Sequence, residues 1–171
     1  MVNITQPLRD EHAELYRSIE ALRQAADTIN ESLTSSAHDQ IEQAYLFLTS
    51  RLFPHAQAEE KVLYPMVQKI MGSEQATATM NRDHAEVAQL TEELGTLRVH
   101  RSQLTITSIQ ARTLRRVLYS LYAILKLHFA KEEDIYLPIL DDKLTLEEAH
   151  TMMEGMDIAY REAKERVSTE I

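Results

Sequence analysis

Along most of this chain, apolar side chains recur at spacings of three and four residues, the pattern of helices with one buried face. The first stripe lies in a helix predicted from Gln6 to Leu33, and its members are Leu8, Leu15, Ile19, Leu22, Ala26, Ile29 and Leu33. His12 fills the gap between Leu8 and Leu15. This histidine is therefore predicted to lie on the buried face and not on the wet one.

A second helix is predicted after Ser35-Ser36, where a serine can cap its N-terminus. Its stripe includes a histidine and a glutamate among the apolar residues: Ile41, Ala44, Leu48, Leu52, His55, Glu59, Val62 and Met66. Pro54 removes one backbone hydrogen bond, so we expect a kink just before His55. Gly72 and Ser73 provide the next helix stop and start.

Three further segments complete the pattern. The third helix carries Met80, His84, Val87, Leu90 and Leu94, ends near His100, and is followed by a loop from Ser102 to Ser108. The fourth has the most regular stripe: Leu114, Leu118, Leu121, Leu125, His128, Glu132, Ile135 and Ile139. Pro138 and Asp141-Asp142 should close it, and Thr145-Leu146-Glu147-Glu148 is a capping box that opens a fifth helix to about Val167.

Short connections between four long helices favour an up-down-up-down antiparallel bundle. We therefore expect an all-α protein, in which residues 1–142 form the four-helix bundle with a dinuclear metal site. Residues 143–171 are expected to add a C-terminal helix packed on the same domain.

Composition narrows the function classes. The chain has 171 residues, only three glycines, a formal net charge of −9 and no cysteine. The negative charge argues against binding to nucleic acid or to an anionic membrane, and the lack of cysteine excludes disulfides and thiolate ligands. The start of the chain does not resemble a signal peptide, and the most apolar stretch, Val117 to Ala130, is too short to cross a bilayer. We expect a cytoplasmic protein.

Six polar residues on the buried stripes repeat along the chain. The order is a lone histidine followed by His-x-x-x-Glu, twice: His12, His55, Glu59, His84, His128 and Glu132. The offset is 72 residues from His12 to His84, and 73 for both members of the second motif. In an antiparallel pair of helices, two residues at the same height have their sequence midpoint in the connection between the helices. The midpoints between these residues on successive helices fall on the predicted connections, so all six should lie at one height.

Taken one at a time, each of these residues would more often be a hydrogen-bonded core residue than a ligand. Together they include two carboxylates among Leu, Ile and Val, with no Lys or Arg on the same stripes to pair with them. Burying an unpaired carboxylate costs several kcal/mol or more, and metal cations would compensate that cost. The six residues therefore predict a two-metal site.

The pattern resembles the hemerythrin-like HHE cation-binding domain over about residues 5 to 142. The resemblance also rests on flanks of the two motifs: Phe53-Pro54-His55, Glu59-Glu60, Tyr64-Pro65, and His128-Phe129 with Glu132-Glu133. It implies a non-haem di-iron centre in which the four histidines are terminal ligands and Glu59 and Glu132 are bridges. Oxygen-carrying members have a fifth histidine four residues from the third-helix histidine, where this chain has Met80 and Ala88, and an aspartate where it has Glu133.

The expected cofactor is therefore two Fe ions, with Mn or Zn as the alternatives that suit imidazole and carboxylate ligands. The resemblance implies binding of O2, a related small oxidant such as peroxide, or NO at an open metal position. A redox enzyme acting on peroxide or NO, a metal or oxygen sensor module, and a metal-free structural bundle are the alternatives. Whether the chain is an enzyme stays open.

Other polar residues are expected to be structural. We expect Glu60 and Glu133 to be solvated or to pair locally; the alternative is that they add a ligand or a hydrogen bond to a ligand. We expect Tyr16, Tyr64 and Tyr136 to close the ends of the core; the alternative is a phenol that donates to bound oxygen or acts in redox steps. Three further histidines are expected on the surface: His38, His100 and His150.

Overall fold

The structure is a computed structural model that describes residues 4–98, 102–103 and 105–169, and its regular elements are helical. The prediction of an all-α protein is confirmed for this part of the chain. The longer elements are α1 (Gln6–Thr28), α2 (Ser35–Phe47), α3 (Phe53–Ala58), α4 (Tyr64–Met71), α5 (Ala78–Leu97), α6 (Ser108–Lys131), α7 (Leu137–Lys143) and α8 (Leu146–Thr169). Single turns join them: the π-helical turns η1 (Leu48–Leu52), η2 (Glu59–Leu63) and η4 (Glu132–Tyr136), and the 3-10 turn η3 (Glu74–Thr77).

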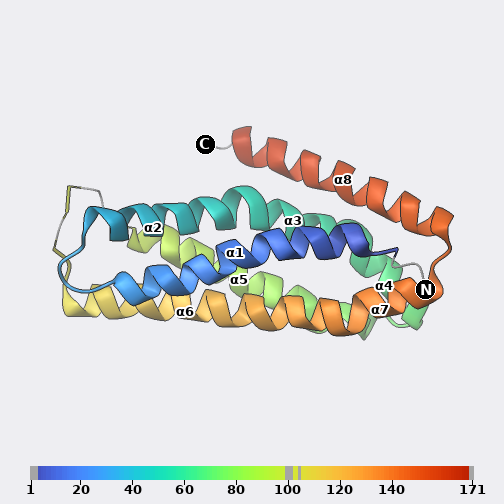
Figure 1. Cartoon of the computed structure of the whole chain (residues 1–171), viewed down its shortest axis with the longest axis horizontal. Helices are drawn as coiled ribbons and strands as arrows, with labels where there is room; N and C mark the ends of the chain where they lie inside the picture. The colour runs from blue at the N-terminus through green and yellow to red at the C-terminus, as the bar shows by residue number, and fades with distance from the viewer. Residues whose placement is uncertain (1–3, 99–101, 104, 170–171) are drawn as a thin grey trace.

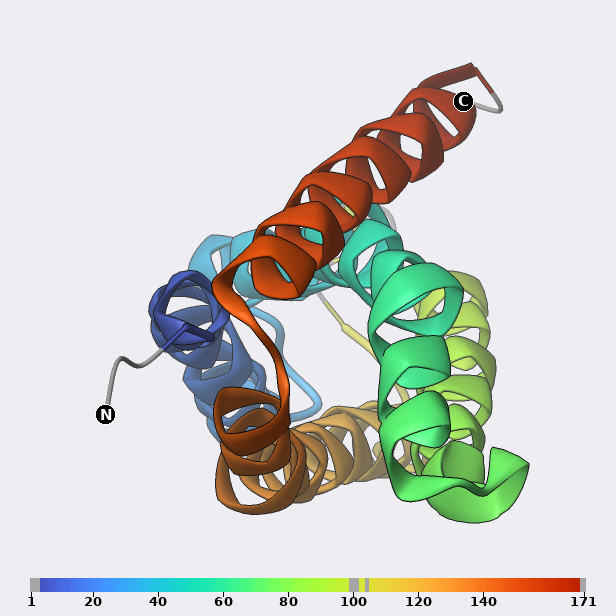
Figure 2. The same cartoon turned by 90° about the vertical axis from the view of Figure 1, so that its right-hand side faces the viewer.

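The first seven helices follow the long axis of the molecule back and forth (Figure 1). Seen along that axis, α1, the run from α2 to α4, α5, and the run from α6 to α7 surround a common centre (Figure 2). Helix α8 crosses the outside of this group and packs against α3 and η2. No described helix is both long enough and apolar enough to span a membrane.

Two clusters of buried apolar side chains fill the interior. The larger one extends from Leu15 on α1 and Leu52 in η1 to Phe129 on α6. The smaller one begins at Leu8 and continues through Leu63 and Leu137 to the inner face of α8. The six predicted polar residues lie between these two clusters, on α1, α3, η2, α5, α6 and η4. A pocket that opens to the surface reaches four of them, His55, Glu59, His84 and His128.

Helix α1 ends at Thr28, five residues before the predicted end at Leu33. Ile29 has an extended conformation, and the Asn30 side chain accepts a hydrogen bond from the Ser32 backbone N–H at 2.8 Å. Such a local side-chain bond competes with helix formation. Ile29 and Leu33 are buried as predicted, although they lie outside the helix.

Most of the helix caps are formed by the residues that the sequence predicted. Gly72 ends α4 in the left-handed conformation with φ 66°, and the side chain of Ser73 caps the next turn. Thr145 and Glu148 form the predicted capping box of α8. The second helix is capped by Thr34 and not by a serine. Helix α5 ends at Leu97, and the predicted end near His100 lies outside the described residues.

Prolines determine where the helices become irregular. Each π-turn ends two residues before a proline, namely Pro54, Pro65 or Pro138. The residue before each proline donates its backbone N–H five residues back: Phe53 to Leu48, Tyr64 to Glu59 and Leu137 to Glu132. A proline ring clashes with the carbonyl four residues back, and a wider turn relieves that clash. Pro138 therefore distorts the fourth helix without ending it, and the helix ends at Lys143, directly after the predicted Asp141-Asp142.

Each π-turn adds one residue and so rotates the buried face that follows it. The predicted stripe placed Ile135 in the core, but Ile135 is 47% exposed, while Tyr136, Leu137 and Leu140 are buried. The same shift after Glu59 buries Leu63 and Tyr64 and leaves Val62 and Met66 only half-buried. The simple spacing of threes and fours was therefore wrong beyond each glutamate.

This shift predicts unequal effects of two neighbouring substitutions. Leu137→Ala should lower the free energy of unfolding by about 2–5 kcal/mol, because it empties a fully buried site. Ile135→Ala should change it by less than about 0.5 kcal/mol, since this side chain is half in water. Urea unfolding of the metal-free proteins measures both, and an equal or larger loss for Ile135→Ala would contradict the rotated face.

Candidate metal centre

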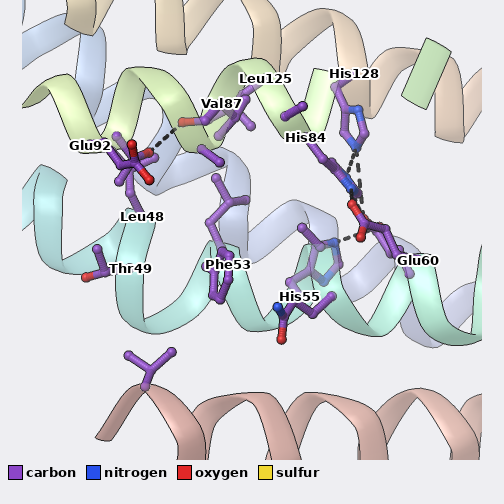
Figure 3. Close-up of a pocket in the computed structure, with 18 of the residues that line it drawn as sticks. Leu48, Thr49, Phe53, His55, Glu60, His84, Val87, Glu92, Leu125 and His128 are labelled. Carbon is purple, nitrogen blue, oxygen red and sulfur yellow. Dashed lines mark hydrogen bonds and ion pairs between the residues drawn. The ribbon is translucent and has the colours of Figure 1, made fainter. Parts of the chain in front are cut away.

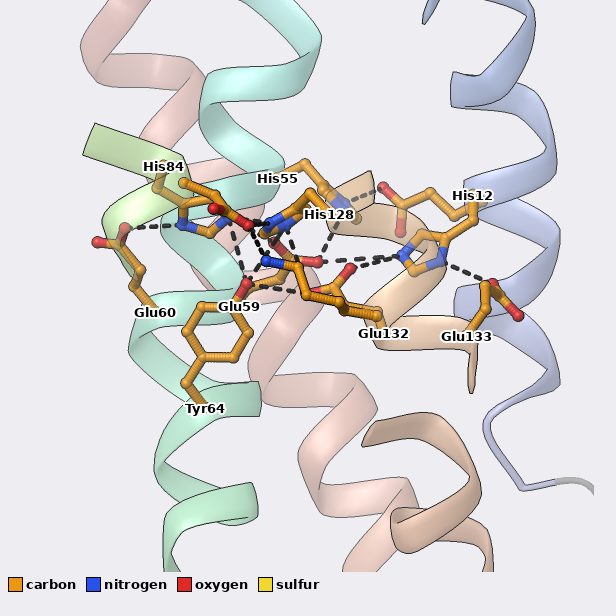
Figure 4. A network of polar contacts seen from close by, with 12 residues as sticks. His12, His55, Glu59, Glu60, Tyr64, His84, His128, Glu132 and Glu133 are labelled. Atoms are coloured by element: carbon orange, nitrogen blue, oxygen red, sulfur yellow. Dashed lines mark hydrogen bonds and ion pairs between the residues drawn. The ribbon is translucent and has the colours of Figure 1, made fainter. Parts of the chain in front are cut away.

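The structure brings the six predicted residues to one place between the helices. His12 comes from α1, and His55 and Glu59 come from the α3–η2 junction. His84 comes from α5, and His128 and Glu132 from the α6–η4 junction; His55, His84 and His128 meet at one end of a pocket (Figure 3). All except His84 are fully buried, and the His84 side chain is 9% exposed. Their ring nitrogens and carboxylate oxygens point toward a common centre (Figure 4).

These residues form two overlapping groups that could each hold a cation. One group is His12, His55, Glu59 and Glu132, and the other is Glu59, His84 and His128. Glu59 places Oε1 2.9 Å from His55 Nε2 and Oε2 3.3 Å from His84 Nε2. Glu132 places Oε2 3.5 Å from His12 Nε2 and Oε1 3.6 Å from His128 Nε2. Glu59 therefore belongs to both groups and offers one oxygen to each, while Glu132 belongs to the first group and turns its other oxygen toward His128 of the second.

Every one of the four histidines also has a carboxylate at its other ring nitrogen. The Nδ1 atoms lie 2.8–3.2 Å from Glu133 (His12), Glu11 (His55), Glu60 (His84) and Asp83 (His128). These contacts join α1 to α3, η2 to α5, α5 to α6 and η4 back to α1. An ionised carboxylate can only accept, so each Nδ1 is assigned as the donor.

This tautomer leaves a lone pair on every Nε2, aimed at the centre. The Nε2 atoms of His84 and His128 lie only 3.1 Å apart. If both rings are neutral, these two nitrogens face each other with lone pairs, and either a proton on one of them or a shared metal ion relieves the repulsion. Two nitrogens that bind one metal ion at about 2.1 Å and at right angles are about 3 Å apart, so the spacing also fits a shared metal ion.

Buried atoms without hydrogen-bond partners fit the same conclusion. Among the described residues, His12 Nε2, His55 Nε2, both oxygens of Glu59 and Glu132 Oε2 are buried and lack a hydrogen bond of acceptable geometry. Orphaned polar atoms of this kind are costly and rare in folded proteins. Nitrogen and oxygen donors around a buried carboxylate pair are ligands that a divalent transition metal accepts. The residues present therefore fit a metal centre.

The pKa values of Glu59, Glu132 and His128 are all shifted strongly from their usual values. Burial and the neighbouring charge of Glu59 raise the pKa of the Glu132 carboxyl to about 8. Although burial opposes ionisation, the adjacent His55 holds the pKa of the Glu59 carboxyl well below its usual range. Burial also works against charge on His128, yet the hydrogen bond to Asp83 and the glutamates raise its pKa to about 9. Protons thus balance these carboxylates when no cation does.

Tyr64 breaks the symmetry of the two groups. Its hydroxyl donates to Glu132 Oε1 at 2.9 Å and lies 3.2 Å from His84 Nε2 and 3.4 Å from His128 Nε2. Burial and the nearby carboxylates of Glu59 and Glu132 raise its pKa well above the usual value. The residue 73 positions later is Leu137, which has no polar atom. A phenol therefore stands beside the His84–His128 group and has no counterpart beside His12–His55.

We call the four carboxylates that contact the histidine Nδ1 atoms the outer carboxylates. Two basic side chains, Arg9 and Lys131, form ion pairs with two of them. Arg9 Nη1 lies 2.6 Å from Glu133 Oε2, and its Nη2 lies 3.0 Å from Asp141. Lys131 forms an ion pair with Asp83. Because these carboxylates hold His12 and His128, the cations fix the orientation of one histidine in each group.

Several polar residues differ from expectation. Glu60 and Glu133 were predicted to be solvated or locally paired, but each contacts a histidine from another helix. Tyr64 was predicted to close the core and instead contacts the site. Tyr136, in contrast, donates to the Ala76 carbonyl, and Tyr16 packs against Phe129, both away from the ligands.

The remaining histidines lie apart from the site. His38 was predicted on the surface, but it is buried and its Nε2 bonds to the Gln103 carbonyl at 2.9 Å. His150 is exposed as predicted, and His100 lies outside the described residues. Glu11 and Asp83 were not predicted as site residues, although they directly precede His12 and His84 and repeat with the same offset of 72.

Comparison with known proteins supports this interpretation of the site. The family model described as Hemerythrin HHE cation binding domain matches residues 3–140. This range includes all six central residues and the four outer carboxylates. Searches of curated proteins and of solved structures gave no significant match.

The outer carboxylates predict a measurable effect on metal binding. Glu60→Ala should weaken Fe(II) or Zn(II) binding roughly 10- to 100-fold, because His84 loses the acceptor that fixes its ring. Glu60 is 47% exposed, so the fold should tolerate the change. Glu86→Ala, at an exposed position on α5, is the matched control and should bind like wild type. Competition with a chelator of known affinity measures both, and equal affinities would contradict this role of Glu60.

Proposed function

The chain belongs to the hemerythrin HHE cation binding domain family, and from this premise we propose that it is a non-haem di-iron protein. Its two iron ions would bind O2, a related small oxidant such as peroxide, or NO. The observation that supports the proposal is the pair of buried glutamates between the four histidines: Glu59 belongs to both ligand groups, and Glu132 has one oxygen near His12 and the other near His128. Mn or Zn could occupy the same donors, since imidazole and carboxylate suit them too.

In this proposal the ligands divide evenly. His12 and His55 hold one iron, His84 and His128 hold the other, and Glu59 and Glu132 bridge them. Bound iron would supply reversible electron transfer and an affinity for O2, NO and peroxide. The apolar layers above and below exclude bulk water, and the four outer carboxylates hold the imidazole rings in place.

The His84–His128 side is where we place the exogenous ligand. This chain has Met80 and Ala88 four residues either side of His84, and neither can replace an imidazole. The Tyr64 hydroxyl stands at this side and already donates to Glu132. It could turn to donate its proton to an oxygen atom of the incoming ligand.

We also propose that residues 1–142 form an up-down-up-down four-helix bundle and that 143–171 belong to the same domain. The supporting contacts are those of α8, whose inner side chains Met152, Met156 and Ala159 belong to the smaller apolar cluster. Lys61 and Glu162 form an ion pair across the same junction at 2.6 Å.

A second candidate is a redox enzyme that turns over peroxide at the same centre. Tyr64 favours it, because a buried phenol beside one metal position can deliver a proton during repeated turnover. A binder needs no such donor, although it can use one.

The two candidates predict different behaviour of protein loaded anaerobically with Fe(II). A binder should develop near-ultraviolet charge-transfer bands with O2 or NO that disappear when the gas is removed. An enzyme should consume many equivalents of H2O2, and Tyr64→Phe should slow this at least about tenfold, the loss of one proton donor. Tyr136→Phe is the matched control, because its hydroxyl bonds away from the site. No bands and no H2O2 consumption would contradict both candidates.

A further inference from the structure

The two groups of candidate ligands are unequal in number and in burial. The group of four, which we call the first position, is fully buried and consists of His12, His55, Glu59 and Glu132. The group of three, which we call the second position, consists of Glu59, His84 and His128, and the His84 side chain is 9% exposed. An ion at the first position therefore has one more ligand from the protein and less contact with water.

The two positions also differ in what their inward atoms already contact. In the first position, the Nε2 atoms of both histidines, Glu59 Oε1 and Glu132 Oε2 are buried and have no hydrogen-bond partner among the described residues. In the second position, the Nε2 atoms of His84 and His128 lie 3.2 and 3.4 Å from the Tyr64 hydroxyl and 3.1 Å from each other. Unpartnered buried polar atoms are costly, so an ion gains most at the first position.

Tyr64 holds the Glu132 oxygen that faces the second position. Its hydroxyl donates to Glu132 Oε1 at 2.9 Å, and this oxygen lies 3.6 Å from His128 Nε2. Glu132 can bridge to the second position only when Oε1 exchanges this hydrogen bond for the ion. At the first position no such exchange is needed, because Glu132 offers its other oxygen there. The Tyr64 hydroxyl therefore competes with the second ion alone.

A pocket of about 710 Å³ opens to the surface beside the second position (Figure 3). All three ligands of this position line it, whereas His12 and Glu132 are not among the described residues that do. The carboxylates of Glu60 and Glu92 also line the pocket and favour cations in it. Ions can therefore enter and leave the second position through the pocket, while protein covers half of the ligands of the first position.

We propose that the two positions bind divalent metal ions in a fixed order. The first ion occupies the first position tightly. The second position, where the ion competes with the Tyr64 hydroxyl, binds more weakly and exchanges its ion through the pocket. This inference rests on the proposed two-metal centre and adds that the protein has a stable form with one ion per chain. It also lets one chain hold two different metals, because the second ion can be replaced while the first stays.

Stepwise addition of Zn(II) to the metal-free protein, in competition with a chelator of known affinity, measures both binding steps. The two Kd values should differ at least about 50-fold, well beyond the factor of about four that two equal, independent positions give. Excess chelator added to the fully loaded protein should then remove one ion quickly and the other slowly. Two steps of similar affinity, or two ions released together, would overturn the proposal.

Two substitutions of the same kind show which position fills first. His84→Ala should keep the tight step and lose the weak one, because all four ligands of the first position remain. His12→Ala should lose the tight step. If repulsion between the two ions alone separated the steps, both variants would weaken the first step equally, and that result would overturn the fixed order.

A milder pair of variants leaves all six central residues in place. Glu11 contacts His55 and Glu60 contacts His84, and the two glutamate side chains are 38% and 47% exposed. Glu11→Ala should weaken the tight step roughly 10- to 100-fold, and Glu60→Ala should weaken only the weak step by a similar factor. Equal or reversed effects on the two steps would overturn the proposal.

Tyr64→Phe tests the competition at Glu132. It should strengthen the weak step severalfold and leave the tight step unchanged, because it frees only Oε1 of Glu132. Tyr136→Phe is the matched control and should change neither step, since its hydroxyl donates to the Ala76 carbonyl. An unchanged weak step in Tyr64→Phe would contradict the proposal.

The stepwise addition, repeated with Fe(II) under anaerobic conditions, separates the fixed order from the two-metal centre on which it rests. If neither metal binds, the two-metal centre falls. If at most one ion binds, the first position stands and the two-metal centre falls. If two ions bind with equal affinity, the centre stands and the fixed order falls.

Discussion

Two glutamates buried between apolar layers impose the constraint on which the rest of this structure depends. Glu59 and Glu132 are fully buried and face four imidazoles, whose inward nitrogens carry lone pairs when the rings are neutral and the outer nitrogens donate to carboxylates. Such a cluster repels itself unless protons or cations enter it. The ring of four imidazole–carboxylate contacts joins each helix to the next. The same imidazole–carboxylate contacts therefore both link the helices and orient the candidate ligands of the centre.

Prolines explain how this constraint is met with ordinary helices. Each of the two bridging glutamates begins a π-turn, and each turn ends two residues before a proline. The widened turn rotates the next residues, which brings Tyr64 to the site on one side and Leu137 to the core on the other. The repeat thus builds two similar groups of candidate ligands, and the Tyr64 hydroxyl beside one of them makes the two groups unequal.

Much of this could be predicted from the sequence. The spacing of His12, His55, Glu59 and their repeats gave the helices, the buried face and the residues that meet. The exposure of Ile135 could not be predicted from spacing alone, but Pro65 and Pro138 carried the signal, since a proline inside a helix requires an irregular turn before it. Pro138 was interpreted instead as a helix end.

The outer carboxylates show a different limit. Glu11 and Asp83 repeat with the same offset as the histidines they precede, and Glu60 and Glu133 repeat with the offset of the glutamates they follow. That repetition was visible, but their partners were not. Glu11 bonds to His55 and Glu133 bonds to His12, so each partner lies on another helix and depends on the rotation of both. Tyr64 was missed for the same reason, because the π-turn sets its direction.

The number of metal ions bound per chain tests the central claim most directly. Equilibrium dialysis against Fe(II) under anaerobic conditions, followed by metal analysis, should give two ions per chain. His84→Ala should bind fewer, because one group loses a terminal ligand while the other keeps its own. His38→Ala, which removes a buried histidine away from the centre, should still bind two. No bound iron, or the same content in all three proteins, would contradict a two-metal centre built on these residues.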